Sequence, residues 1–265
     1  MTVQEEIRVK RPVMILFDYG QTLVNEAPFD GVRGTEAVLQ YCVENKYHLT
    51  AEQIQQEAAA INGELGRFDP ARRHLQQVEV SNHMFTAYLY ESLGIKLSLT
   101  GEQLDQVFWD AASPGRPTEG CTVFLKYLAE QGIRTGVISN ISYCGQVVER
   151  RIRNLFPGHP FEFILATSEY MFRKPNRRIF ELALEKAGLK PGAEWQSGAL
   201  LPSVWYIGDQ YECDIVGAAG AGLFPVWYTG AMYMLPESHE GVVTAASWEE
   251  VRTILEASEK ETRGR

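Results

Sequence analysis

Five short runs of apolar residues constrain the fold of this chain more than any other feature. They span Val13–Phe17, Arg134–Ile138, Phe161–Ala166, Ser203–Ile207 and Phe224–Tyr228. The runs are nearly continuous in aliphatic and aromatic residues, which is typical of strands that are covered on both faces. Helical patterns lie between the later runs, and strands that alternate with helices predict a parallel sheet with right-handed crossovers. The expected fold class is therefore α/β.

We expect a helical insertion between the first two strands, because the hundred or more residues between them are far too many for one crossover. The helical patterns cover Val32–Glu44, a segment from an N-cap at Thr50, Leu75–Leu93 and Thr100–Ala112. Pro28 and Ser113–Gly120 mark the two ends, since proline and glycine interrupt regular structure. We predict a Rossmann-like, doubly wound parallel sheet of residues 1–26 and 117–265, with an α-helical cap domain of residues 27–116.

The composition is that of an ordinary globular chain, with 45% hydrophobic and 22% charged residues, and it excludes a disordered, collagenous or coiled-coil protein. The formal net charge of −9 repels nucleic acid and anionic lipid, so neither is an expected partner. No apolar run reaches the roughly 18 residues of a membrane span, and the N-terminus lacks the apolar stretch of a signal peptide. We expect a cytoplasmic monomer or homodimer whose four cysteines are reduced and packed.

Polar residues that suit catalysis follow four of the predicted strands. They are Asp18 and Gly20, Ser139 and Asn140, Lys174, and Asp209 and Asp214. Ligands of a parallel sheet collect beyond the carboxyl ends of its strands, so we expect these groups to converge on one crevice. Phosphoryl transfer to a carboxylate requires such a set: a nucleophile, donors for the phosphoryl oxygens and a divalent cation. Each residue taken singly also has a structural interpretation. Asp18 could cap a helix, Ser139 is typical of a turn, and Lys174 is typical of an exposed surface.

Four motifs of this chain resemble those of the haloacid dehalogenase superfamily: FDYGQT, VISN, RKPNRRIF and YIGDQYECD. The resemblance covers nearly the whole chain and is greatest for the branch with a helical cap after the first motif. It implies a hydrolase of a small phosphorylated or anionic metabolite, in which Asp18 forms an aspartyl intermediate and Ser139 and Lys174 bind the transferable group. It also implies Mg²⁺ held by Asp18, the main-chain carbonyl of Gly20, Asp209 and Asp214, the last of which supports the metal or orients Lys174.

Gly20 departs from the phosphatases of that superfamily, which have a second aspartate at this position. The backbone carbonyl of glycine still serves a metal, but the missing side chain would protonate the leaving oxygen and deprotonate the attacking water. The loss of such a group typically costs about 10²–10⁴ in rate. We therefore expect a slow or atypical phosphatase, or an acid supplied by His74 or Glu26.

Two other functions stay open. The first is another chemistry of the superfamily: haloacid hydrolysis, in which a tyrosine stands at the position of Gly20 and no metal is used, or phosphonate hydrolysis, which needs a cap lysine such as Lys46 or Lys96. The pair of carboxylates after the fourth strand argues against the haloacid reaction. The other function is a non-catalytic module that binds a phosphorylated ligand, against which the retained Asp18 and Lys174 argue.

We expect substrate contacts from Asn140 and from residues 67–74, a segment that separates two predicted helices. Arg72 and Arg73 in this segment have planar guanidinium groups that bind phosphate or carboxylate. An exposed loop with solvated arginines is the alternative there. The aromatic residues Tyr228, Tyr233 and Trp248 fit either a dimer surface or the core.

Overall fold

The computed structural model describes residues 10–67, 77–189, 201–231, 239 and 241–263. Its centre is a six-stranded sheet in the order β10-β9-β8-β1-β6-β7, and every neighbouring pair in it is parallel. The strands are β1 (Met14–Phe17), β6 (Arg134–Ser139), β7 (Ile164–Ala166), β8 (Leu201–Gly208), β9 (Leu223–Tyr228) and β10 (Val243–Ala245). The predicted α/β class and parallel sheet are confirmed, and β10 adds an edge strand that the apolar runs did not predict.

The order of the strands creates a switch point beside β1. The chain fills the sheet from β1 through β6 to β7, and then from β8 through β9 to β10 on the other side of β1. In open sheets of this kind, ligands bind beyond the carboxyl ends of the strands where the order reverses. Here the crevice is expected at the ends of β1 and β8.

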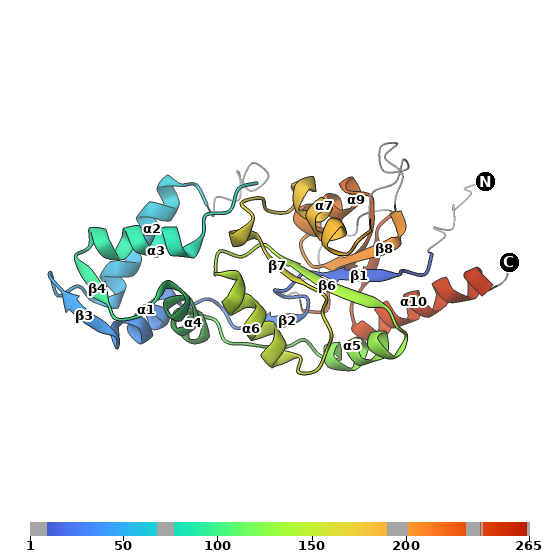
Figure 1. The fold of residues 1–265 in the computed structure, drawn as a ribbon, viewed down its shortest axis with the longest axis horizontal. Coiled ribbons are helices and arrows are strands. Elements are labelled where there is room, and N and C mark those ends of the chain that lie inside the picture. The colour runs from blue at the N-terminus through green and yellow to red at the C-terminus, as the bar shows by residue number, and fades with distance from the viewer. Residues whose placement is uncertain (1–9, 68–76, 190–200, 232–238, 240, 264–265) are drawn as a thin grey trace.

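Helices cover both faces of the sheet (Figure 1). One layer contains α7 (Arg177–Lys186) and α9 (Gly217–Gly220), and the other contains α5 (Cys121–Glu130), α6 (Gly145–Leu155) and α10 (Trp248–Arg263). Along β1, Met14 and Leu16 pack into the first layer, whereas Ile15 and Phe17 pack into the second. All four side chains are fully buried, because successive residues of a strand point to opposite faces and both faces are covered.

Tyr228 and Trp248 belong to the core of the second layer. Each is 2% exposed, and their rings stack with centroids 4.5 Å apart. The alternative of a dimer surface is therefore wrong for these two residues, whereas Tyr233 lies outside the described residues.

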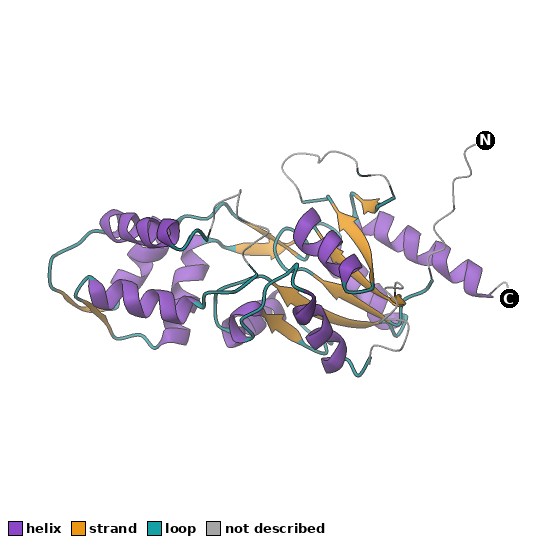
Figure 2. Ribbon diagram, turned by 90° about the horizontal axis from the view of Figure 1, so that it is seen from above, coloured by secondary structure: helices purple, strands orange, loops and turns teal. Residues whose placement is uncertain are grey.

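The insertion forms a separate group of helices at one end of the molecule (Figure 2). They are α1 (Gly31–Leu39), α2 (Ala51–Glu64), α3 (Asn82–Ser92) and α4 (Gly101–Ala112). A hydrophobic cluster of their own, which includes Val38, Ile54 and Leu104, holds these helices together. The predicted N-cap Thr50 is confirmed, Thr100 caps the helix that was predicted to start there, and each forms a capping box with the glutamine three residues later.

Two of the predicted helices differ from the structure at their ends. The first stops at Leu39, and β3 (Cys42–Asn45) then pairs antiparallel with β4 (Ile95–Leu97). The third begins only at Asn82, after the N-cap Ser81. Helical spacing within a short stretch could not reveal this pair of strands, because the two strands that stabilise each other lie far apart in the sequence.

Backbone hydrogen bonds are among the contacts that join the insertion to the rest of the molecule. β2 (Val24–Glu26) pairs antiparallel with β5 (Gly115–Pro117), so the two connections form one ribbon rather than two separate linkers. Farther along, the Glu79 amide donates to the Met171 carbonyl at 2.6 Å, and the Arg173 amide donates to the Gln77 carbonyl at 2.9 Å.

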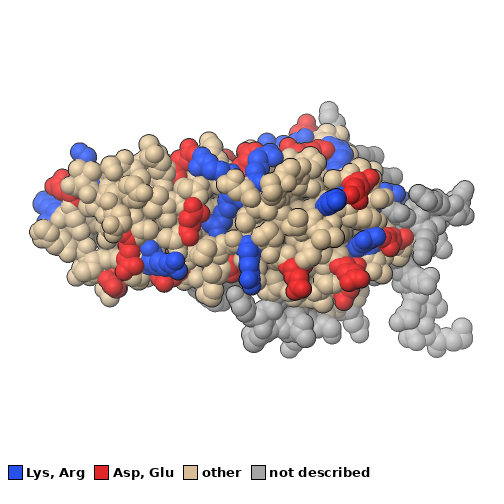
Figure 3. Space-filling view, turned by 90° about the horizontal axis from the view of Figure 1, so that it is seen from below, with Lys and Arg blue, Asp and Glu red and all other residues tan. Residues whose placement is uncertain are grey.

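Charged side chains of both signs are interspersed on the face shown in Figure 3, and its described part has no continuous basic patch. Within the described residues, no helix combines the length and the apolar character needed to cross a membrane.

Candidate active site

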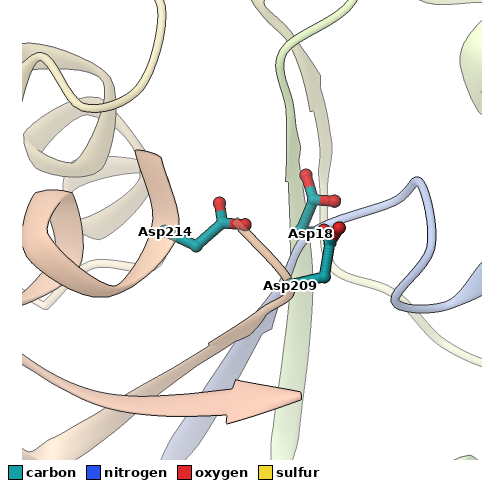
Figure 4. A group of neighbouring side chains, drawn as sticks. All are labelled: Asp18, Asp209 and Asp214. Atoms are coloured by element: carbon teal, nitrogen blue, oxygen red, sulfur yellow. The ribbon is translucent and has the colours of Figure 1, made fainter. Parts of the chain in front are cut away.

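Three carboxylates meet at the switch point of the sheet (Figure 4). Asp18 directly follows β1, Asp209 directly follows β8, and Asp214 lies on the π-helical turn η3 (Tyr211–Val216) that follows. One carboxylate oxygen from each lies within 4.8 Å of the others, and all three residues are buried. The sequence analysis predicted this convergence from the strand ends, and the structure brings the three residues together.

Lys174 joins two of these carboxylates. Its Nζ lies 2.5 Å from Oδ1 of Asp18, 2.6 Å from Oδ1 of Asp214 and 2.6 Å from the hydroxyl of Tyr206. The side chain is only 2% exposed, which excludes the alternative of a solvated surface lysine. The sequence analysis missed Tyr206. A tyrosine within an apolar strand was nevertheless a signal, because a buried tyrosine hydroxyl usually has a hydrogen-bond partner.

The charges of the cluster are unbalanced, with three carboxylates around one ammonium. Burial lowers the pKa of Lys174, but Asp18 and Asp214 outweigh burial and raise it above its usual range. Burial, opposed by Lys174 and reinforced by Asp214, raises the pKa of Asp18 to about 6. Burial and the neighbouring carboxylates raise the pKa of Asp209 to about 8. The surplus of negative charge and the oxygen donors fit a hard divalent cation such as Mg²⁺.

A glycine and a tryptophan shape the turn after β8. A Cβ atom on Gly208 would overlap the carboxylate of Asp214, so only glycine lets that side chain fold back over the strand end. Asp214 is fixed there by the amide of Gln210, which donates to its Oδ2 at 2.9 Å. Trp227 Nε1 donates to the main-chain carbonyl of Asp209 at 2.8 Å. The acidic pair is thus held by its own loop and by β9.

Ser139 and Asn140 occupy the end of β6, as predicted, but they differ in their contacts. Ser139 is 3% exposed and its hydroxyl makes no hydrogen bond with the described residues. The Asn140 carboxamide accepts from the Lys174 amide at 2.8 Å and donates to the Lys174 carbonyl at 2.9 Å. Asn140 therefore holds the backbone of the lysine, whereas Ser139 is available to a ligand.

A pocket of about 390 Å³ opens over the cluster. Among the residues that line it are Asp18, Gly20, Glu26, Ser139, Asn140, Lys174 and Asp209. Of the other predicted site residues, Asp214 is not among the pocket-lining residues but contacts Lys174, which is, and Arg72, Arg73 and His74 lie outside the described residues. Lys46, directly after β3, and Lys96, in β4, are the lysines considered for an imine; both are exposed at the outer end of the insertion (Figure 1) and do not line the pocket.

A larger cavity of about 860 Å³ lies between the helices of the insertion and the loop after β6. It shares Phe29, Arg67, Ser142 and Tyr143 with the pocket over the carboxylates, so the two spaces are neighbours with common walls. Most of its lining is apolar or aromatic, and includes Phe85, Leu89, Tyr90 and Phe108.

Glu26, at the end of β2, is held at the rim of the pocket by aromatic and basic groups. Its Oε1 accepts from Trp109 Nε1 at 2.9 Å and from the Tyr19 hydroxyl at 3.2 Å. The Arg151 guanidinium lies 3.4 Å from the same oxygen. Burial raises the pKa of Glu26, although Arg151 and the two hydrogen bonds act in the opposite direction.

Glu79 is a second buried carboxylate near the pocket, and the sequence analysis missed it. Its Oε1 lies 3.2 Å from Arg173 and 3.6 Å from Arg67, and its Oε2 accepts from Thr167 at 2.8 Å. It thereby joins Arg67 of the insertion to Arg173 of the loop between β7 and α7. Nothing in the local sequence distinguishes Glu79 from a surface residue, because its partners come from distant segments.

The sequence model of the haloacid dehalogenase-like hydrolase family matches residues 14–222 of this chain. That stretch begins with β1 and contains every one of the carboxylates described above. The chain belongs to this hydrolase family.

Curated relatives of this haloacid dehalogenase-like hydrolase differ in how much of them it matches. It is 26% identical to the pyrimidine 5'-nucleotidase YjjG of Escherichia coli strain K12, over 91% of this chain and 96% of that protein. It is 37% identical to the glyceraldehyde 3-phosphate phosphatase of Methanothermobacter thermautotrophicus, over 41% of this chain and 42% of the relative. Its match to haloacid dehalogenase-like hydrolase domain-containing protein 3 of Mus musculus, at 27% identity, spans 46% of that protein, or about half its length.

Among solved structures, this hydrolase resembles the 2-haloacid dehalogenase of Pseudomonas syringae pv. Tomato DC3000. The TM-score is 0.62 at 19% identity, over 94% of this chain and 99% of that one. At this identity the likeness supports the shared fold alone.

Proposed function

We propose that this chain is a Mg²⁺-dependent phosphatase that hydrolyses a phosphate ester of a small metabolite through an aspartyl-phosphate at Asp18. The observation that carries the proposal is the ammonium of Lys174, which is held against Asp18 in a pocket that also contains Asp209. A nucleophilic carboxylate attacks a phosphate only if the charge that builds up is neutralised by fixed groups. The relatives named as a nucleotidase and a phosphatase support the same reaction class.

In the proposed reaction, an Asp18 oxygen bonds to phosphorus as the bond from phosphorus to the leaving oxygen breaks. Water then attacks phosphorus, releases inorganic phosphate and returns the Asp18 carboxylate. Lys174 and Ser139 bind the phosphoryl oxygens, and Asp214 orients Lys174. A bound Mg²⁺, held by Asp18, the Gly20 carbonyl and Asp209 with Asp214 nearby, would supply the remaining positive charge.

We further propose that residues 27–116 act as a cap and that the alcohol part of the substrate occupies the larger cavity. Its volume of about 860 Å³ is that of a ligand site, and its lining of aromatic side chains suits an apolar or ring-bearing group. Nucleoside monophosphates are therefore the first substrates to assay. Arg72 and Arg73 remain candidates for further substrate contacts.

The test is phosphate release from p-nitrophenyl phosphate and acetyl phosphate, with Mg²⁺ and with a chelator. We expect turnover only with Mg²⁺, and a loss of at least about 10³-fold in Asp18→Asn, because the amide is not a nucleophile. Glu130→Gln, a change on the exposed side of α5, is the matched control and should retain full activity.

Two results would count against the phosphatase. Folded wild-type protein that turns over neither substrate but binds phosphate with Mg²⁺ would favour a non-catalytic binding module. Equal activity of the wild type and Asp18→Asn would exclude an aspartyl-phosphate at this position.

A further inference from the structure

The space beside Gly20 is filled by a carboxylate from elsewhere in the chain. An ideal Cβ atom built on Gly20 would lie 3.8 Å from Oε2 of Glu26. Apart from the chain neighbours of Gly20, no other described atom lies within 4 Å of that point. The carboxylate oxygens of an aspartate at position 20 would extend about 2.4 Å from its Cβ. The Glu26 carboxylate therefore borders the space that an acidic side chain at position 20 would enter.

The two oxygens of Glu26 have different surroundings. Oε1 is anchored by Trp109, Tyr19 and Arg151. Oε2 makes no hydrogen bond within the described part of the chain, and the side chain is 21% exposed at the pocket. The anchored oxygen fixes the position of the carboxyl group, and the other oxygen is open to a ligand. A general acid requires this combination of fixed placement and one accessible oxygen.

The anchor extends from the ribbon into both parts of the molecule. Glu26 ends β2, where it pairs with Gly115 of β5. Trp109 belongs to α4 of the insertion and Arg151 to α6 beside the sheet, and the Arg151 guanidinium lies over the Trp109 ring at 4.0 Å. The placement of Glu26 is thus set by long-range packing.

We infer that Glu26 is the general acid and base of this active site, in place of the side chain that Gly20 lacks. The inference rests on the proposed phosphatase function. In the first step, Oε2 gives its proton to the leaving oxygen as that oxygen separates from phosphorus and Asp18 bonds to phosphorus. In the second, the Glu26 carboxylate takes a proton from the water whose oxygen bonds to phosphorus, and Asp18 leaves as a carboxylate.

Glu26 also supports the ribbon, so the experiment must separate a structural role from proton transfer. The substrates are substituted phenyl phosphates that range from p-nitrophenyl phosphate, whose leaving group departs without a proton, to phenyl phosphate, whose leaving group needs one. Glu26→Gln keeps an oxygen for Trp109 and Tyr19. We expect kcat/KM of this variant to fall about 10²-fold or more for phenyl phosphate, and less than about 10-fold for p-nitrophenyl phosphate.

A rescue variant provides the second measurement. A Cβ atom on Gly20 has room, since its nearest neighbour outside the adjoining residues would be Oε2 of Glu26 at 3.8 Å, and in Glu26→Gln the change Gly20→Asp adds a carboxyl group beside the neutral amide. The double variant should regain at least about 10-fold in kcat/KM toward phenyl phosphate, within the range of a general acid. Gly20→Asp alone should gain nothing, because Glu26 already supplies the acid and the two carboxylates would repel each other. Glu130→Gln is again the surface control.

A structural role for Glu26 predicts an equal loss along the whole substrate series and no rescue by Gly20→Asp, and either result would overturn the inference. If Asp18→Asn abolishes turnover while Glu26→Gln shows no dependence on the leaving group, only the role of Glu26 fails. If the wild type hydrolyses none of the phosphates, the proposed function and this inference fail together.

Discussion

Individual residues in this structure owe their chemical state to burial and to a few fixed partners. Lys174 stays charged although it is almost fully buried, because Asp18, Asp214 and Tyr206 surround its ammonium. Removing one member of a buried ion pair typically costs about 3–5 kcal/mol, since it leaves a charge uncompensated. Asp214 does not line the pocket, so it affects the pocket by holding Lys174 in place.

His159 allows a prediction of pH dependence at this scale. Burial lowers its pKa from 6.5 to about 4. Its ring packs on Phe161 with centroids 4.3 Å apart, and Nε2 lies 2.8 Å from Oγ1 of Thr135. Because the unfolded chain binds the proton first, this residue favours folding above pH 6.5, and its contribution is lost as the pH falls toward 4. His159→Gln should flatten the decline of the unfolding free energy between these pH values.

The measurement is urea unfolding at several pH values, in which only the slope with pH is compared. His48→Gln, at an exposed position after β3, is the control and should keep the wild-type slope. Identical slopes for His159→Gln and the wild type would show that His159 is as easily protonated in the folded state as in the unfolded state.

At the scale of elements, the insertion depends on close packing between α1 and α4. Gly34 of α1 faces α4, and a Cβ atom there would lie 2.8 Å from both the Ala112 Cβ and the Phe108 ring. Gly63 lies in α2, where an added Cβ would meet nothing within 4 Å. A glycine-to-alanine substitution therefore adds a methyl group at a crowded position in α1 and at an open position in α2.

We expect Gly34→Ala to destabilise the protein by about 1–3 kcal/mol, because the two helices must move apart. Gly63→Ala should stabilise it by about 0.5–1 kcal/mol, because alanine loses less conformational freedom in a helix and has room for its methyl group. Chemical denaturation of both variants checks the pair. A stabilising Gly34→Ala would mean that α1 and α4 are not as closely packed as described.

At the scale of the whole molecule, the candidate active site lies where the two halves of the sheet meet. Asp18 comes from the first part of the chain and Asp209 from the last, and their charges repel across the boundary between β1 and β8. A cation bound at this boundary interacts only with the folded state, so it stabilises the entire fold by mass action.

Mg²⁺ should therefore raise the melting temperature. At about 100 times its Kd, a ligand contributes ~2.7 kcal/mol, which corresponds to several degrees for a chain of this size. Asp209→Asn should melt above the wild type in a chelator, because one of the repelling carboxylates is gone, and should lose most of the response to Mg²⁺. Differential scanning calorimetry tests both effects, with Glu130→Gln as the control. A full Mg²⁺ response in Asp209→Asn would place the ion elsewhere.

The sequence by itself determined the parallel sheet, because burial on both faces leaves a continuous apolar run such as Met14–Phe17. It also determined which residues follow the strand ends, and this was enough to predict that Asp18, Lys174 and Asp209 converge. These features depend on the spacing of residues within one segment, so the sequence of that segment is enough to predict them.

Only the tertiary structure decided what surrounds those residues. Three contacts join segments that are distant in the sequence: the hydroxyl of Tyr206 on Lys174, the pairing of β2 with β5, and the pairing of β4 with β3, whose residues overlap a predicted helix. The same holds for Glu26, which local spacing could name as a candidate but could not place beside Gly20. Such contacts depend on how whole elements pack against one another, and periodicity within one element carries no information about its partner.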